Sequence, residues 1–344
     1  MGCWIKWRNN ATQQIPSNRN MSNEFQIIRQ FFQHDISKYP DLLLGVGDDA
    51  AVWMPPADRR QVVAMDTLVS QVHFLESWSA HDIGYRALAV NLSDLAAMGA
   101  TPRWALLSIA APQMDERWFE DFARGFFKLA RQYEVALIGG DMTRGPFTIT
   151  VTIGGDIALP QQPLTRSNAQ VGDCICVTGS LGLAALALAD HQGQVTLTSP
   201  DRHTAYQQWL CPQPHILAGQ LLLPMANAAI DISDGLAQDL SHILQASQVG
   251  ARLQMAQLPI AATLATYATP AQQLQWALTG GDDYQLCVTM APTQYLAAKQ
   301  CLVDHGIALT RIGEITATGG LQCVQEDQSL LELATLGYQH WNQT

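Results

Sequence analysis

The spacing of apolar residues along the chain predicts strands and helices in alternation from residue 22 onward. Apolar positions in 22–32 recur with helical spacing, and Ser22 is a suitable N-cap for that helix. Beyond it, short apolar runs predict strands and longer amphipathic segments predict helices. In the first half we expect strands at 62–64, 105–109, 136–138 and 148–153, and helices at 82–98 and 116–133.

A proline-rich stretch at 156–163 separates these elements from a second set. In the second half we expect strands at 173–177, 251–255 and 284–288, and helices at 181–191 and 234–247. Strands that alternate with helices of this length are typical of α/β domains. We therefore predict an α/β (α+β) protein with two domains, at 21–158 and 164–344.

The first twenty residues differ from the rest of the chain. They carry three basic residues, no acidic residue and no periodic pattern, whereas a helical pattern starts directly after Met21. We predict that residues 1–20 are a disordered extension and that the native chain starts at Met21. Deleting them is expected to leave folding and activity intact, as measured by thermal unfolding and by turnover; a large loss of either would contradict this.

The composition is that of a folded but acidic chain. Hydrophobic residues make up 48% of the 344 residues and charged residues only 14%, which excludes global disorder. The 30 acidic residues outnumber the 19 Lys and Arg, giving a net charge of −11. We expect no nucleic-acid partner and no membrane partner, because both present anionic surfaces that attract basic patches. The acidic residues are 22 Asp and only 8 Glu, and Asp concentrates in turns and metal sites.

The cysteines and apolar runs predict a cytoplasmic protein. Of the seven cysteines, only Cys174 and Cys176 lie close together. Their C-x-C spacing puts both on one face of a strand, where buried free thiols are common, and a zinc or redox pair is the less favoured interpretation. The longest apolar run, 181–189, is too short to cross a bilayer, and the N-terminus lacks the apolar core of a signal peptide.

Most residues with the chemistry for a site are aspartates beside Gly or Ser. Taken singly, such segments are usually structural turns, because Asp caps helices and Gly adopts positive φ. Taken together they suggest a site: Asp66 and Asp141 end apolar strands, where α/β proteins bind ligands, and Asp94 lies inside an amphipathic helix. The segments are 45–49, 64–67, 91–94, 139–141, 231–235 and 280–283.

These carboxylates have few basic neighbours in the sequence, namely Arg103, Arg144 and Arg166. Several converging carboxylates repel one another unless a cation binds between them. Oxygen ligands of this kind suit Mg²⁺, which keeps several waters and bridges to phosphates. We therefore predict a site for Mg²⁺ and phosphate, with plain turn chemistry as the alternative.

Two familiar nucleotide-binding patterns do not apply. Residues 45–50 match G-x-G-x-x-A, but Asp48 and Asp49 would meet a dinucleotide pyrophosphate with like charge. The chain contains no G-x-x-x-x-G-K-[ST], which excludes a Walker-type kinase. The charge of a bound phosphate would instead be met by metal and arginine.

In their order along the chain, these motifs resemble those of the thiamine-monophosphate kinase family, within the ATP-binding superfamily that includes aminoimidazole ribonucleotide synthetase. The resemblance runs from about Glu24 to Trp341. Its most specific pieces are GVGDDAAV (45–52), MDTLVSQVHF (65–74), ALAVNLSDLAAMGATP (87–102), IGGDMTRG (138–145), IDISDGLAQDL (230–240) and the turn at 280–284.

The resemblance implies a PurM-like fold, with an N-terminal mixed-sheet domain that binds ATP and Mg²⁺ and forms a homodimer, and a C-terminal α/β domain. It also implies transfer of the γ-phosphate of ATP to thiamine monophosphate, the final step of thiamine diphosphate biosynthesis. ATP is then the co-substrate, and several Mg²⁺ ions are the cofactor.

The resemblance also implies roles for individual residues. The metal ligands would be Asp49, Asp66, Asp94, Asp141, Asp231 and Asp234. ATP would contact Gly140, Asp141, Arg166 and Ser233, and thiamine phosphate would contact His73, Asp282 and Tyr338. No residue is expected to act as a general base, because the attacking phosphate oxygen is already ionised at pH 7 and catalysis reduces to positioning and charge neutralisation.

Some positions depart from the family pattern. Ala64 and Met65 replace the usual hydroxyl pair before Asp66, so a metal contact there would come from backbone carbonyls. Asp282 stands where the family more often has Glu, and its shorter side chain reaches less far. Without the motif, His73 is more typical of a structural histidine, and Tyr338 fits a core aromatic as well as a ring that stacks on thiamine.

Two other interpretations stay open. The first is a different ATP-dependent enzyme of the same superfamily. A hydrogenase-maturation protein typically ends in a reactive cysteine, whereas this chain ends WNQT. A selenophosphate-forming protein needs an N-terminal Cys-Lys region, and Cys3 lies in the predicted extension. A catalytically silent nucleotide-binding module is favoured by loss of the metal aspartates, and all six are present.

Overall fold

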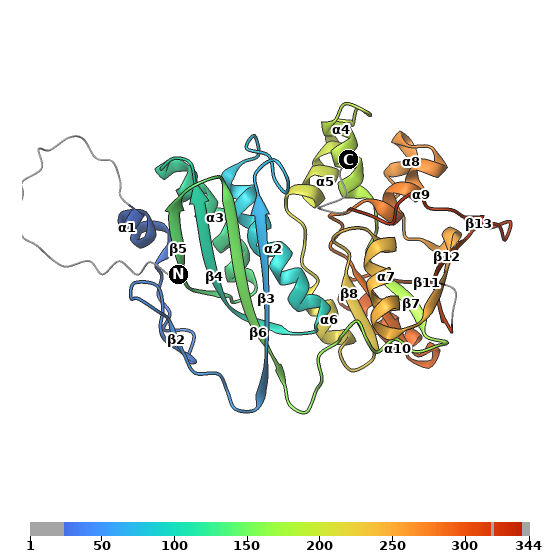
Figure 1. The fold of residues 1–344 in the computed structure, drawn as a ribbon, viewed down its shortest axis with the longest axis horizontal. Coiled ribbons are helices and arrows are strands. Elements are labelled where there is room, and N and C mark those ends of the chain that lie inside the picture. The colour runs from blue at the N-terminus through green and yellow to red at the C-terminus, as the bar shows by residue number, and fades with distance from the viewer. Residues whose placement is uncertain (1–23, 318–319, 339–344) are drawn as a thin grey trace, which may run out of the picture.

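The chain folds into two units, each built around its own β-sheet, which pack side by side (Figure 1). A computed structural model of the protein describes residues 24–317 and 320–338. The predicted extension 1–20 and the predicted cap Ser22 lie outside these residues. Helical structure is present from α1 (Glu24–Ile27) through the π-helical turn η1 (Ile28–Phe32), as the apolar spacing predicts.

The N-terminal unit contains a four-stranded sheet of order β3-β6-β4-β5. Its strands are β3 (Arg59–Val69), β4 (Thr101–Ala111), β5 (Ala136–Arg144) and β6 (Thr148–Ala158). Strands β4 and β5 run parallel, and the other neighbours run antiparallel. A separate pair, β1 (Leu42–Leu44) and β2 (Val52–Trp53), holds the loop 45–51 between its strands. Because this loop joins two strands rather than a strand and a helix, it is not a dinucleotide-binding turn.

Two long helices, α2 (Ala80–Ala97) and α3 (Glu116–Gln132), pack against one face of this sheet (Figure 1). The side chains of Ser79 and Asp115 cap their first turns by accepting hydrogen bonds from free backbone N–H groups. Gly84 lets the two helices approach closely, since a Cβ there would lie 2.1 Å from the carbonyl oxygen of Phe122.

The C-terminal unit is a seven-stranded mixed sheet of order β13-β12-β9-β11-β7-β10-β8. Its strands are β7 (Cys174–Thr178), β8 (Ala228–Asp231), β9 (Gly250–Gln254), β10 (Leu286–Met290), β11 (Leu309–Thr316), β12 (Leu321–Val324) and β13 (Leu330–Leu331). Its helices are α4 (Leu183–His191), α5 (Ser199–Leu210), α6 (Ile216–Leu222), α7 (Leu236–Ser247), η2 (Met255–Gln257), α8 (Leu264–Tyr267), α9 (Pro270–Thr279) and α10 (Pro292–Val303). Cys174 and Cys176 are buried free thiols of β7, as the C-x-C spacing predicts.

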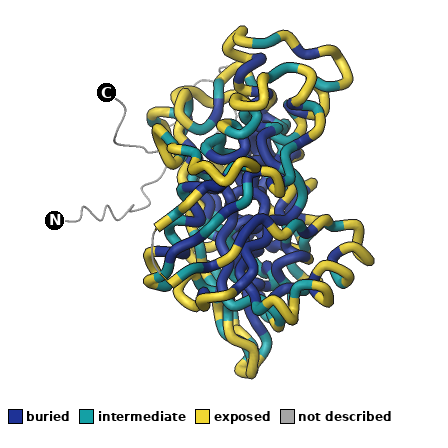
Figure 2. The backbone as a smooth tube through the Cα atoms, turned by 90° about the vertical axis from the view of Figure 1, so that its right-hand side faces the viewer, coloured by how far each residue is buried: buried dark blue, intermediate teal, exposed yellow. Residues whose placement is uncertain are grey.

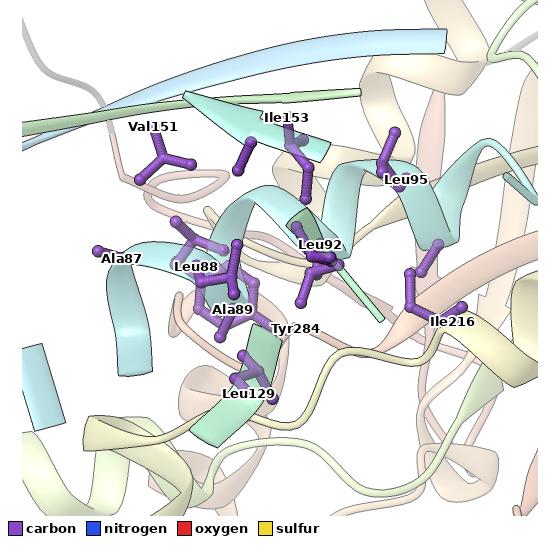
Figure 3. Packing of buried hydrophobic residues seen from close by; sticks show 14 of the residues in the cluster. Ala87, Leu88, Ala89, Leu92, Leu95, Leu129, Val151, Ile153, Ile216 and Tyr284 are labelled. Carbon is purple, nitrogen blue, oxygen red and sulfur yellow. The ribbon is translucent and has the colours of Figure 1, made fainter. Parts of the chain in front are cut away.

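Helix α2 lies at the junction of the two units and is buried on nearly all sides. Fifteen of its 18 residues are buried. Figure 3 shows apolar side chains of both units packed along α2, among them Leu92 of α2 itself, Ile153 of β6 and Ile216 of α6. One core cluster contains residues of both units, so the two units share one hydrophobic core. Figure 2, which looks from the side of the C-terminal unit, shows buried backbone at the centre and exposed backbone on the outside. Among the described helices, none has the length and apolarity needed to cross a membrane.

Several strands extend beyond their predicted ends, and three of these extensions concern the candidate site or the domain junction. Asp66 lies inside β3 and Asp141 inside β5, rather than at the strand ends, and they pair with Val151 and Ser108. Strand β6 likewise continues to Ala158, into the segment predicted as a domain junction. The physical reason is that backbone hydrogen bonds to a neighbouring strand extend past the apolar stretch, and side-chain patterns do not report them.

Candidate functional site

Helix α2 brings aspartates from separate segments into one cluster. Asp94 lies on α2, Asp66 on the adjacent β3, and Asp231 at the end of β8. The pKa of Asp94 is raised to about 8, mainly by burial and to a smaller extent by the negative charges of Asp231 and Asp66. The pKa of Asp66 is raised to about 6, again mainly by burial and then by the negative charges of Asp231 and Asp234. Four of the predicted metal ligands therefore lie close enough to repel one another.

Two polar residues of α2 hold this cluster in place. The Ser93 hydroxyl donates to Oδ2 of Asp231 at 2.7 Å, and Oδ1 of Asn91 accepts from the backbone N–H of Asp66 at 3.0 Å. Both side chains are fully buried, where polar groups are retained only with partners. Neither was predicted as a site residue; the available signal was a pair of polar residues in an otherwise apolar helix.

A further aspartate, Asp239, fixes the loop that carries Asp231 and Asp234. Its Oδ2 accepts from the backbone N–H groups of Asp234 and Gly235 at 3.0 and 3.1 Å, in the first turn of α7. Burial, followed by the charge of Asp231, raises the pKa of Asp239 to about 8. Asp239 was also not predicted, although a carboxylate in the first turn of a helix is a typical capping pattern.

The cluster fits a divalent cation. Partly buried carboxylates that raise one another's pKa values are stabilised when a cation takes the place of their protons. Arg166, which is exposed, is close enough for its charge to counteract part of the pKa rise at Asp94 and Asp231. Within residues 24–317 and 320–338, no group of three or more Asp, Glu, His or Cys residues could hold a metal ion by itself. An ion here would therefore complete its shell with water or phosphate oxygens, as Mg²⁺ does.

The raised pKa values predict that the metal-free protein loses stability as the pH rises. In the unfolded chain these carboxyl groups ionise with their ordinary pKa of 3.8, whereas in the folded chain Asp66 and Asp94 keep protons up to about pH 6 and 8. Because the folded state binds more protons over this range, its free energy of unfolding falls between about pH 5 and 8, by on the order of 5 kcal/mol. Thermal unfolding should show this fall, and saturating Mg²⁺ should raise Tm more at pH 8 than at pH 5. An equal effect of Mg²⁺ at both pH values would contradict the prediction.

The structure does not bring Asp49 and Asp141 to this cluster within one chain. Asp49 is exposed in the loop between β1 and β2, and Asp141 is exposed on the edge strand β5. The strand register places Gly140 three strands away from Asp66, roughly 14 Å at the usual strand spacing. Gly140 and Asp141 instead line a small, largely apolar cavity of about 60 Å³ beneath Phe32 of η1. A side chain at Gly140 would not fit, because a Cβ would lie 1.8 Å from a carbonyl oxygen of β4.

Two of the residues predicted to contact thiamine phosphate are hydrogen-bonded to the loop 231–235, which carries Asp231 and Asp234. The backbone N–H of Tyr338 donates to the carbonyl of Asp234 at 3.1 Å, and that of Asp282 donates to the carbonyl of Ser233 at 2.8 Å. Asp282 and Tyr338 therefore flank the segment that carries two predicted metal ligands. His73 follows the end of β3, where its Nδ1 accepts from a backbone N–H four residues earlier at 3.0 Å.

Two buried ionisable residues beside Asp282 were not predicted. Arg86 of α2 forms an ion pair with Asp282. Asp283 accepts from the backbone N–H of Gly182 at 2.9 and 3.1 Å, and burial raises the pKa of its carboxyl well above the ordinary value. The sequence feature that could have pointed to Arg86 is a basic residue inside an apolar stretch. For Asp283 it is a second Asp after the Gly-Gly pair.

Known proteins match nearly the whole chain. Residues 47–157 match the N-terminal domain of AIR synthase related proteins, and residues 170–325 match the C-terminal domain of these proteins. The chain is 42% identical to the thiamine-monophosphate kinase of Escherichia coli (strain K12) over 319 residues, which cover 92% of this chain and 98% of that protein. It is 34% identical to the thiamine-monophosphate kinase of Bacillus subtilis (strain 168), over 93% of this chain and 99% of that one.

Solved structures have the same fold. The crystal structure of thiamine-monophosphate kinase from Stenotrophomonas maltophilia K279a matches with a TM-score of 0.79 and 44% identity, covering 83% of this chain and 91% of that one. AaThiL complexed with AMPPCP and TMP matches with a TM-score of 0.73 and 27% identity, covering 92% and 97%. Hydrogenase maturation protein HypE in complex with ATP has a TM-score of 0.70 at 20% identity, covering 90% and 93%, and so shares the fold alone.

Proposed function

The chain belongs to the thiamine-monophosphate kinase family of AIR synthase related proteins, and from this membership we propose that it transfers the γ-phosphate of ATP to thiamine monophosphate. The observation that carries the proposal is the carboxylate cluster of Asp66, Asp94 and Asp231, which lies next to the loops of Asp282 and Tyr338. A phosphate donor and a phosphate acceptor can thus be held side by side. One relative of this fold is complexed with AMPPCP and TMP together.

The chemistry needs positioning and charge neutralisation rather than proton abstraction. The attacking phosphate oxygen of the acceptor is ionised at pH 7, so no general base is required. Mg²⁺ bound at the cluster would supply the positive charge that lets two anionic phosphate groups approach each other. We assign the metal at the cluster to Asp66, Asp94, Asp231 and Asp234. Asp49 and Asp141 lie apart from this cluster in one chain, so we assign them to a further Mg²⁺ ion.

Other residues of the site orient these groups. Ser93 and Asn91 hold Asp231 and the Asp66 backbone, so the carboxylates do not rearrange during the reaction. We assign the ATP contacts to Gly140, Asp141, Arg166 and Ser233, and the acceptor contacts to His73, Asp282 and Tyr338.

The direct test is release of ADP from ATP and Mg²⁺, with and without thiamine monophosphate. We expect ADP release to depend on thiamine monophosphate and to stop when Mg²⁺ is chelated. ADP release that ignores thiamine monophosphate but responds to another acceptor would point to a different reaction of the superfamily. Binding of ATP without turnover of any acceptor would support a silent nucleotide-binding module.

We also propose a cytoplasmic location. The six cysteines of the described segments are free thiols, which is the usual state in a reducing compartment. Cell fractionation with a soluble cytoplasmic marker would test this, and recovery with the periplasm or the membrane would contradict it.

We propose that the chain forms a homodimer through the β3 part of the sheet face that points away from α2 and α3, here called the open face. The β1–β2 pair covers the β4–β5 part of the same face, where Trp53 packs on Trp104. Helices α2 and α3 cover only the opposite face of this sheet. On the open face, β3 exposes Val63 and Met65 to 58% and 63%, because alternate residues of a strand point to opposite sides. Large apolar side chains grouped on an uncovered sheet face are typical of an association surface.

Met65→Glu is expected to convert the dimer into a monomer. A charge at the centre of an apolar interface is desolvated without a partner, so the dimer dissociation constant should rise on the order of 10³-fold. Light scattering coupled to gel filtration measures the mass directly. Leu296→Glu, at an apolar residue of α10 that is 75% exposed, is the matched control and should leave the mass unchanged. A dimeric Met65→Glu variant would contradict this interface.

A further inference from the structure

A buried arginine of α2 reaches across the junction of the two units into the acceptor loop, residues 280–284. Arg86 is 2% exposed, and its Nη2 forms an ion pair with Oδ1 of Asp282. Its Nη1 donates to the carbonyl of Trp209 on α5 at 2.6 Å. The indole N–H of Trp209 donates to the other carboxylate oxygen, Oδ2 of Asp282, at 3.2 Å. Both oxygens of Asp282 are therefore held by groups outside its own loop.

The acceptor loop needs this external support. Asp282 and Tyr284 both adopt left-handed backbone conformations, with φ of +66° and +48°, which are unfavourable for residues with a side chain. Their backbone N–H groups donate to the carbonyls of Ser233 and Ile232 at 2.8 and 2.7 Å, beside the metal ligands. The position of the Asp282 carboxylate thus depends on Arg86 on one side and on the metal-binding loop on the other.

The contacts of Arg86 differ from those of an ion pair that only stabilises the fold. The Nε of Arg86 is buried and has no acceptor among the described residues, and a buried donor without a partner is unfavourable. Arg202 and Asp190, in the α4–α5 region, instead form a two-pronged pair through Nε and Nη2, both at 3.0 Å. Arg86 spreads its contacts over Asp282, the α5 backbone and the ring of Tyr284, whose centroid lies 5.6 Å from Cζ.

We propose that Arg86 is a positioning residue for the phosphate acceptor, which sets the Asp282 carboxylate at a defined place relative to Asp94. The proposal rests on the proposed function. Arg86 and Asp94 are eight residues apart on α2, about 12 Å along the helix axis, so the helix connects the acceptor loop rigidly to the carboxylate cluster. A weaker Arg86 contact displaces the acceptor loop. Of the four assigned ATP contacts, Gly140, Asp141 and Arg166 lie on other segments, and Ser233 is joined to the acceptor loop through its backbone carbonyl.

The first test is Arg86→Lys, which keeps the charge but cannot contact Asp282 and the Trp209 carbonyl with one planar group. We expect the KM for thiamine monophosphate to rise about tenfold, with the KM for ATP changed less than about twofold. The matched control is Arg202→Lys, which is expected to change neither KM. An equal rise of both KM values in Arg86→Lys, or no rise in either, would overturn the proposal.

The second test asks whether Arg86 acts through Asp282. In the Asp282→Asn background, Arg86→Gln leaves no buried charge unpaired, so it should fold and should change the KM for thiamine monophosphate less than about twofold beyond Asp282→Asn alone. Effects that multiply would overturn the proposal. The wild-type protein is the reference: if it does not phosphorylate thiamine monophosphate, the proposed function fails and this proposal with it. If it does, and Arg86→Lys behaves like the wild type, the positioning role alone fails.

Discussion

Replacing Asp94 with Asn is expected to leave a folded protein with almost no turnover. Asn has nearly the same shape as Asp but carries no negative charge, so it cannot balance a divalent cation at the centre of the cluster. Removing one such electrostatic contact to the transferring phosphate should lower the rate on the order of 10²-fold or more. The measurement is ADP release at saturating ATP, thiamine monophosphate and Mg²⁺.

The same variant is expected to be more stable than the wild type when Mg²⁺ is absent. Without Mg²⁺ at pH 8, Asp94→Asn removes a partly buried charge that Asp231 and Asp66 repel, so Tm should rise relative to the wild type. Asp304→Asn, at an exposed position after α10, is the matched control and should keep turnover within about twofold. Near-normal turnover of Asp94→Asn at saturating Mg²⁺ would exclude the proposed role, and a lowered Tm of the metal-free variant would exclude the repulsion.

Leu92→Ala is expected to destabilise the whole chain by about 3 kcal/mol. Leu92 is fully buried at the junction, in the core cluster that also contains Ile153 and Ile216 (Figure 3), and the truncated side chain leaves a cavity that this packing cannot close. For a cooperative chain of 344 residues the loss corresponds to a fall in Tm of roughly 4 °C. Thermal unfolding followed by circular dichroism or calorimetry measures it.

Because Leu92 belongs to a core shared by both units, the unfolding transition should shift as a whole. Leu296→Ala is the control, since Leu296 is 75% exposed and its truncation creates no cavity. Two separate transitions, of which only one moves in Leu92→Ala, would show that the units do not share a core.

Elements with strong apolar periodicity could be predicted from the sequence. The helices at 82–98 and 116–133 correspond to α2 and α3 within two residues at each end, because each buries a long row of apolar side chains. Helices α5 and α10 were missed, since each buries only two residues and the remaining positions carry no clear pattern. The short strands β12 and β13 at the edge of the sheet were missed for the same reason.

The supporting residues of the site were harder to predict than the carboxylates. Asp66, Asp94, Asp231 and Asp234 stand in short polar motifs that are visible in one sequence. Their supports are spread over the chain: Ser93 lies 138 residues from its partner Asp231. Sequence spacing carries no information on a contact between segments that meet only through tertiary packing.

An excess of aspartate over lysine, placed in short motifs, is visible in the amino-acid sequence and predicts phosphate held by metal. Which of these aspartates meet depends on how the chain packs. Helix α2 packs between the two sheets, and this places Asp94 beside Asp66 and Asp231 while Asp141 stays three strands away from Asp66. The physical reason is that charged groups converge only where buried apolar surface offsets their repulsion and desolvation, and that surface comes from segments far apart in the sequence.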